Sequence, residues 1–65
     1  MSDFITRLQS ELEELTIKVN SLQIFLETDK FLDLNNVNQI LLNEQFLVMK
    51  KYSDLLKIRL ELLKK

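Results

Sequence analysis

The sequence predicts an all-α protein, an antiparallel two-helix hairpin that assembles into a homo-oligomeric helical bundle. Three observations support this prediction. The 65 residues include no Gly and no Pro, the residues that most often mark turns. Apolar side chains recur with helical spacing over two long stretches, and a polar, turn-prone stretch separates them. At 46% hydrophobic residues the chain is too apolar to be disordered, and its length allows one small domain over residues 1–65.

The first helix is expected over residues 3–28. Its apolar residues repeat at i, i+3, i+4 and i+7 and form one stripe about 100° wide. The stripe consists of Phe4, Ile5, Leu8, Leu12, Leu15, Val19, Leu22 and Leu26. Ser2 or Asp3 is expected to cap the N-terminus. Ile17 and Ile24 lie one heptad apart outside the stripe, as ordinary exposed residues or as a contact with another chain.

A corner is expected over residues 29–36, where the helical pattern breaks. The stretch contains Asp and Asn side chains, which compete with helical backbone hydrogen bonds. Asn35 is the preferred N-cap of the second helix, with Asp33 or Asn36 as alternatives. Phe31 and Leu34 are expected to fill the closed end of the hairpin, because large apolar residues are usually buried.

The second helix is expected over residues 36–63. Its apolar residues cover about 260° of the circumference, although one partner helix covers only roughly a third. Only a narrow polar strip interrupts them: Gln39, Asn43, Lys50, Asp54, Lys57, Glu61 and Lys64. The excess apolar surface must contact other chains, and domains of this size often need oligomerisation for stability. We therefore expect an obligate homo-oligomer, a dimer or larger, with the second helix at its centre.

A polar column runs through the apolar face of the second helix. Its members stand seven residues apart and so lie nearly above one another: Asn38, Gln45, Tyr52 and Arg59. Arg7, Glu11 and Lys18 share one edge of the first helix. If the corner lies near residue 32, the numbers of facing residues sum to about 63–66. The expected neighbours are Glu11 with Tyr52, Lys18 with Gln45, and Arg7 with Arg59.

These two polar sets have a structural and a functional interpretation. In the structural one, Glu11 pairs with Arg7 or Arg59, while Gln45 and Tyr52 fix the register of the oligomer. In the functional one, the sets form an anion pocket between chains, with six candidate ligand-binding residues. The positively charged side chains of Arg7, Lys18 and Arg59 would contact phosphates. Tyr52 would stack on a base or donate a hydrogen bond, and Gln45 would contact a base edge or orient Lys18. The candidates are Arg7, Glu11, Lys18, Gln45, Tyr52 and Arg59.

Composition and charge make several function classes improbable. Without His or Cys the chain lacks the commonest metal ligand, the usual proton shuttle near neutral pH and any thiolate. We therefore expect no enzyme, no cofactor and no metal. Residues 1–33 carry three basic and seven acidic side chains, a charge of −4, and residues 34–65 carry six and three, +3. This balance favours an antiparallel hairpin and argues against a partner that is a nucleic-acid polymer. A soluble, cytosolic protein is expected, since no run approaches the ~18 apolar residues of a membrane span.

The second helix also resembles a group of small helical phage proteins named after a crAss-like bacteriophage protein. The resemblance rests on the pattern Leu41-Leu42-x-x-Gln45-x-x-x-Met49-x-x-Tyr52-x-x-x-Leu56-x-x-Arg59. The first helix and the corner are similar too, through Phe4, Arg7, Glu11, Leu15, Lys18, Leu22, Phe25, Phe31 and Leu34. The resemblance implies a phage accessory protein in the cytoplasm of the infected bacterium. In size and architecture alone, the chain also resembles phage sponge hairpins that sequester cyclic nucleotide signals of CBASS or Thoeris immunity.

Two hypotheses follow. In the first, the oligomer is a non-enzymatic counter-defence sponge whose interchain pockets hold a cyclic di- or trinucleotide signal. In the second, it is a protein–protein interaction module that binds a host or phage protein through Ile17, Ile24 or the remaining surface of the second helix. The polar sets are then internal register locks.

Overall fold

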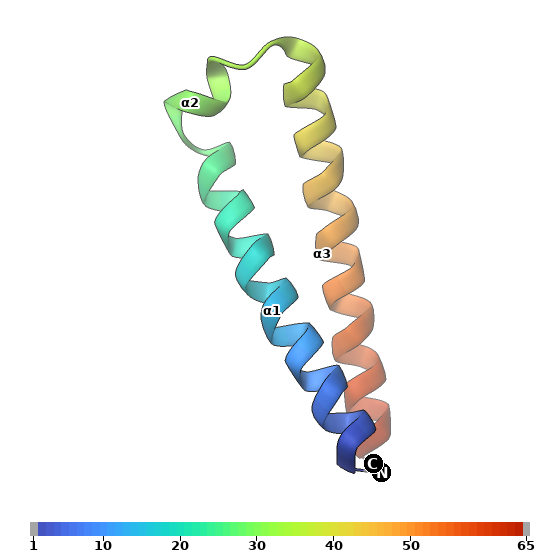
Figure 1. Cartoon of the computed structure of the whole chain (residues 1–65). Helices are drawn as coiled ribbons and strands as arrows, with labels where there is room; N and C mark the ends of the chain where they lie inside the picture. Colours follow the sequence, from blue (N-terminus) through green and yellow to red (C-terminus); the bar gives the residue numbers. More distant parts are fainter. Residues whose placement is uncertain (1, 65) are drawn as a thin grey trace.

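A computed structural model describes residues 2–64 of the chain. These residues form two long helices, α1 (Ser2–Leu26) and α3 (Asn36–Lys64), joined through the single-turn helix α2 (Asp29–Leu32). The long helices run antiparallel, so that the start of α1 lies beside the end of α3 (Figure 1). The hairpin is a rod with principal extents of 47 × 14 × 13 Å. The predicted all-α antiparallel hairpin is therefore confirmed.

The ends of the helices differ from the expected ones in detail. α1 begins at Ser2, so Asp3 lies in its first turn, where its negative charge favours the helix dipole, rather than at the cap. The side chain of Ser2 lies outside the described part of the structure. α1 ends at Leu26, two residues before the expected end at residue 28, and the Thr28 hydroxyl donates a hydrogen bond to the Phe25 carbonyl oxygen at 2.6 Å.

The corner contains one helical turn that the sequence did not predict. In α2 the Asp33 amide donates to the Asp29 carbonyl oxygen at 3.2 Å. Phe31 is buried and meets Phe25 edge to face, with ring centroids 6.3 Å apart. Burying this ring holds the short turn in place, because a single helical turn is unstable by itself. The expected filling of the closed end is confirmed for Phe31, and Leu34 is half-buried.

Asn35 caps α3, as the sequence predicted. Its side-chain oxygen accepts a hydrogen bond from the Asn38 amide at 2.9 Å, which satisfies a donor that has no partner within the helix. Gln39, the residue after Asn38, links α3 to the corner. Its side-chain amide donates to the carbonyl oxygens of Leu32 and Leu34, at 3.2 and 2.8 Å. The start of α3 and the end of α2 are thus tied together.

The core of the hairpin lies toward its open end, where the helix termini meet. Leu8, Leu56 and Leu60 form the buried cluster there. Three half-buried residues of α1 pack against it: Ile5, Leu12 and Leu15. Ser53 is also buried, and its hydroxyl bonds to the Lys50 carbonyl oxygen of its own helix at 2.9 Å. Toward the corner α1 and α3 diverge (Figure 1). The leucine cluster thus holds the two helices together at the open end of the hairpin.

Much of the apolar surface of α3 remains outside this core. Among residues 2–64 the buried hydrophobic residues are Leu8, Val19, Phe31, Leu56 and Leu60. Nine large apolar residues of α3 are exposed: Val37, Ile40, Leu41, Leu47, Val48, Leu55, Ile58, Leu62 and Leu63. The hairpin partner therefore covers one side of α3 only. Within the described residues no helix is both long enough and apolar enough to cross a membrane.

Candidate functional site

Four of the six predicted site residues gather on one flank of the hairpin near its open end. Arg7 and Glu11 project from α1, and Tyr52 and Arg59 from α3. On each helix the two residues are separated by one or two turns, so they lie on one side. The antiparallel register brings the two pairs together, because the leucine core of Leu8, Leu56 and Leu60 holds the helices in contact here.

The Tyr52 hydroxyl donates a hydrogen bond to the Glu11 carboxylate. This contact between residues 41 positions apart confirms the predicted neighbours and fixes the register of the hairpin. The hydrogen bond raises the pKa of Tyr52 above its ordinary value of 10.0. Loss of hydration and the negative charge of Glu11 raise the pKa further, whereas the positive charge of Arg59 opposes them. The phenol is therefore kept protonated as a hydrogen-bond donor.

A surface pocket of about 260 Å³ adjoins this hydrogen bond. Its lining consists of Phe4, Arg7, Leu8, Glu11 and Arg59. The chain contains two arginines and one tyrosine, and all three side chains lie at this place. The lysines of residues 2–64 are instead distributed along the rod. Two guanidinium groups, a phenol and an aromatic ring are suited to an anion that carries a flat, stackable group.

Lys18 and Gln45 lie elsewhere. Both are exposed, Lys18 on α1 and Gln45 on α3, and neither lines the pocket. The Gln45 side-chain amide points along its own helix, with its nitrogen 3.7 Å from the Met49 sulfur. Within one chain the structure does not bring Lys18 or Gln45 into the pocket. Asn38, the first member of the polar column, is exposed in the first turn of α3.

Phe4 is a pocket residue that the site prediction left out. It lines this pocket and also a neighbouring apolar one of about 250 Å³ formed with Arg59, Leu62 and Leu63. The signal was its position, because Phe4 precedes Arg7 by three residues and Glu11 by seven, on the same edge of α1. Among residues 2–64 no group of three or more His, Cys, Asp or Glu is arranged to hold a metal ion.

Comparison with known proteins identifies the family. The model of a family named Sequestin matches residues 2–62. The chain belongs to the Sequestin family. A relative, described as "Uncharacterized 7.5 kDa protein in denB-rIIB intergenic region" of Enterobacteria phage T4, is 40% identical over 60 residues. The match covers 92% of this chain and 94% of that protein. No solved structure matches the chain.

Membership in the Sequestin family confirms the coarser part of the expected resemblance. A relative is a small phage protein, and the match extends over most of the chain. The family that matches is Sequestin, and the finer resemblance to the group named after a crAss-like phage protein stays a prediction. The matched range includes the four residues gathered at the open end, Arg7, Glu11, Tyr52 and Arg59.

Proposed function

We propose that this protein is a non-enzymatic phage counter-defence protein, which sequesters a cyclic nucleotide immune signal in pockets between copies of the chain. It would act in the cytoplasm of the infected bacterium. The observation that carries the proposal is the meeting of both arginines and the single tyrosine beside one pocket. The family name, Sequestin, implies a sequestering role and so supports the proposal.

Each side chain has a role that follows from its chemistry. The guanidinium groups of Arg7 and Arg59 suit phosphate oxygens, to which arginine donates paired hydrogen bonds. Tyr52 and Phe4 present aromatic faces on which a base can stack. Glu11 holds the Tyr52 hydroxyl and accepts hydrogen bonds from ribose hydroxyls or base amino groups. With neither His nor Cys in the chain, binding without cleavage suits this set better than catalysis.

Thermal unfolding with a panel of cyclic di- and trinucleotides tests the proposal. A ligand at 100 times its dissociation constant adds ~2.7 kcal/mol to the stability of the folded state. For a domain of this size, that corresponds to a rise in Tm of roughly 10–20 °C. The ligand should be recovered intact after the protein is denatured. No rise with any member of the panel would overturn the proposal.

Two variants localise the site. Arg59→Ala should abolish the rise in Tm, because it removes one of the two guanidinium groups. Lys64→Ala is the matched control, since it removes an exposed positive charge from the last turn of the same helix. If Arg59→Ala dissociates the oligomer instead, the polar residues act as register locks.

A second candidate function rests on a separate observation, the exposure of Ile17 and Ile24 at 65% and 66%. They lie seven residues apart on α1, and Ile17 lines a surface hollow of about 490 Å³ with Leu12, Glu13, Thr16 and Lys57. Such a pair suits a contact with a host or phage protein. If this second function is correct, the double variant Ile17→Ser with Ile24→Ser should no longer protect the phage from host defence. The nucleotide panel should then give no rise in the Tm of the wild-type protein. Under the first proposal, the double substitution leaves the rise unchanged.

A further inference from the structure

The side of α3 that faces away from the hairpin core carries a strict heptad pattern. Six large apolar residues stand at alternating spacings of three and four or their sum: Val37, Leu41, Val48, Leu55, Ile58 and Leu62. Glu44 and Lys51 occupy the two remaining positions of the same pattern. We name these eight positions the outer seam. Its apolar members are 49–66% exposed, whereas Leu56, on the side of α3 that packs in the core, is completely buried.

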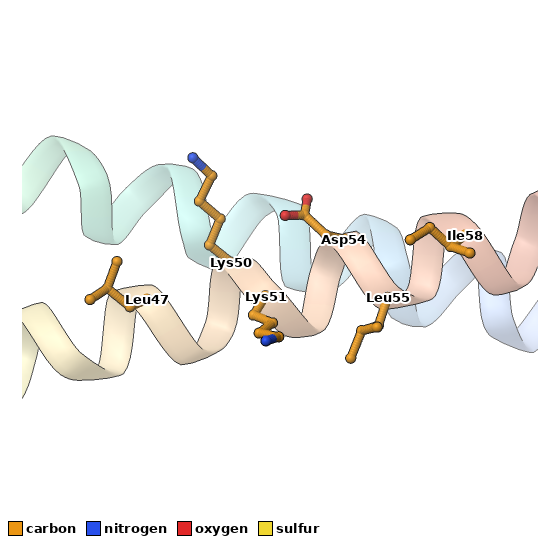
Figure 2. A pocket seen from close by; sticks show the side chains of 6 residues that line it. All are labelled: Leu47, Lys50, Lys51, Asp54, Leu55 and Ile58. Atoms are coloured by element: carbon orange, nitrogen blue, oxygen red, sulfur yellow. The ribbon is translucent and has the colours of Figure 1, made fainter.

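The pattern of the outer seam is the one that packs helices into coiled coils. A repeat of 3.5 residues keeps the same side of a helix against a partner over many turns. A shallow groove of about 370 Å³ borders the seam. Three of its lining residues are seam positions, Lys51, Leu55 and Ile58, and the others lie beside the seam on α3: Leu47, Lys50 and Asp54. Figure 2 shows that these side chains are spaced along α3 and that none comes from α1. Apolar side chains of a second helix can pack into the spaces between the seam residues, as they do in a coiled coil.

We propose that a second copy of this chain packs antiparallel on the outer seam, with a two-fold axis between Met49 and Lys50. In this register the apolar ends of the seam meet: Val37 lies against the partner's Leu62, and Leu41 against the partner's Ile58. Near the axis Val48 lies against the partner's Lys51. All eight positions of each seam are then in contact, which gives the isologous contact of a closed dimer.

Charge selects the antiparallel arrangement. In a parallel pair, Glu44 would meet the partner's Glu44 and Lys51 the partner's Lys51, and both contacts repel. In the antiparallel pair, Glu44 and the partner's Lys51 lie one layer apart, about 6 Å along the axis, within reach of two long side chains. The pattern of one acidic and one basic position is therefore complementary to itself only when the copies run in opposite directions.

This arrangement also completes the candidate site, an inference that rests on the proposed function. A two-fold axis brings the same flank of both α3 helices together. The polar column forms that flank, because each of its members directly follows a seam residue and all four are exposed: Asn38, Gln45, Tyr52 and Arg59. Tyr52 then lies beside the partner's Gln45, and Arg59 beside the partner's Asn38. The amides that each pocket lacks would come from the other copy.

Cysteine crosslinking tests the direction of packing, since the chain has no cysteine. Val37→Cys and Leu62→Cys chains, prepared separately and mixed, should oxidise to a covalent dimer that contains one of each. Neither variant should crosslink with itself. Crosslinking of Val37→Cys with itself would show parallel packing and overturn the proposal. A folded monomer at micromolar concentration in sedimentation would also overturn it and leave the outer seam to a different protein.

Charge exchange tests the register independently. Glu44→Lys or Lys51→Glu alone should weaken dimerisation roughly tenfold, because each places like charges on both sides of the axis in the antiparallel pair. The double variant Glu44→Lys with Lys51→Glu should restore it. In a parallel pair neither single variant would relieve or add repulsion. Dissociation measured by sedimentation, with no restoration in the double variant, would contradict this register.

Ligand binding separates this inference from the proposed function. Gln45→Ala should lower the affinity for a nucleotide from the panel about tenfold while the dimer persists, with exposed Gln23→Ala as the matched control. An antiparallel dimer that binds no nucleotide would refute the proposed function and leave the dimer standing. Nucleotide binding by a monomer would refute the dimer and leave sequestration standing.

Discussion

Arginine and lysine occupy different places in this chain. Arg7 and Arg59 line one pocket, while the lysines among residues 2–64 are all exposed along the rod. A guanidinium group offers a planar fork of donors that matches a phosphate, whereas an ammonium group is a compact, strongly hydrated charge. Glu11 lies with both arginines in the pocket and leaves the three residues a net charge of +1. The pocket therefore keeps a positive charge that favours an anion.

Tyr52 provides an optical test of the Glu11 contact. The chain has one tyrosine and no tryptophan, so the change in near-ultraviolet absorbance when a phenol ionises reports Tyr52 alone. We expect the Tyr52 pKa to lie above 10.0 and to fall in Glu11→Ala, which removes the hydrogen-bond acceptor and its negative charge. Glu14→Ala, at an exposed position of the same helix, is the control and should leave the pKa unchanged. Equal pKa values in wild type and Glu11→Ala would refute the contact.

The same pKa shift has a consequence for stability. The folded protein binds the Tyr52 proton more tightly than the unfolded chain, because its pKa is raised above 10.0. This contribution is complete below the unfolded pKa and is lost as pH rises through the folded one. The free energy of unfolding should therefore fall more steeply in alkali for wild type than for Tyr52→Phe. Denaturant unfolding at a series of pH values measures the difference, and parallel curves would contradict it.

At the scale of elements, the junction between α2 and α3 depends on two polar side chains. Asn35 caps α3 through the Asn38 amide, and Gln39 donates to two carbonyl oxygens of the corner. These hydrogen bonds act together with the packing of Phe31 on Phe25, which holds the α2 side of the corner. Removing either polar side chain should therefore weaken the junction between α2 and α3.

Asn35→Ala should lower the free energy of unfolding by ~0.5–2 kcal/mol, because the Asn38 amide loses its acceptor. Asn36→Ala is the matched control, since Asn36 is exposed and is the first residue of α3. Chemical denaturation at one protein concentration compares the variants. An Asn35→Ala variant as stable as Asn36→Ala would show that the cap contributes nothing.

Sequence reasoning predicted the elements that depend on local pattern. The hairpin, the Asn35 cap and the Glu11–Tyr52 neighbours follow from helical periodicity and a fixed register. It missed α2, because that turn depends on Phe31 packing against Phe25, a tertiary contact. The expected proximity of Lys18 and Gln45 stays a prediction, and neither side chain lines the pocket of Arg7 and Arg59. The oligomer was predicted from excess apolar surface and stays a prediction.

At the scale of the whole molecule, the hairpin has a very small interior. A domain of this length has a stability of about 3–10 kcal/mol, and a single buried leucine is a large share of it. Leu56 is the fully buried residue at the centre of the leucine cluster. The exposed apolar surface of the outer seam contributes stability only when another chain covers it, so stability should depend on protein concentration.

Leu56→Ala should lower the free energy of unfolding by ~2–5 kcal/mol, through lost burial and the cavity left behind. Ile24→Ala serves as the control, because Ile24 is 66% exposed. Helical circular dichroism against denaturant, at equal protein concentration, measures both. Similar losses in the two variants would mean that the core lies elsewhere than in the Leu8–Leu56–Leu60 cluster.

The meeting of both helix termini beside the arginine pocket has a practical consequence for labelling. Phe4 and Leu63 stand within a few residues of the described ends, and each lines a pocket that Arg59 also lines. An affinity tag or fluorescent fusion on either terminus is therefore expected to obstruct the occupant of that pocket. A reporter dye at the corner, at the far end of the 47 Å rod, would leave it open.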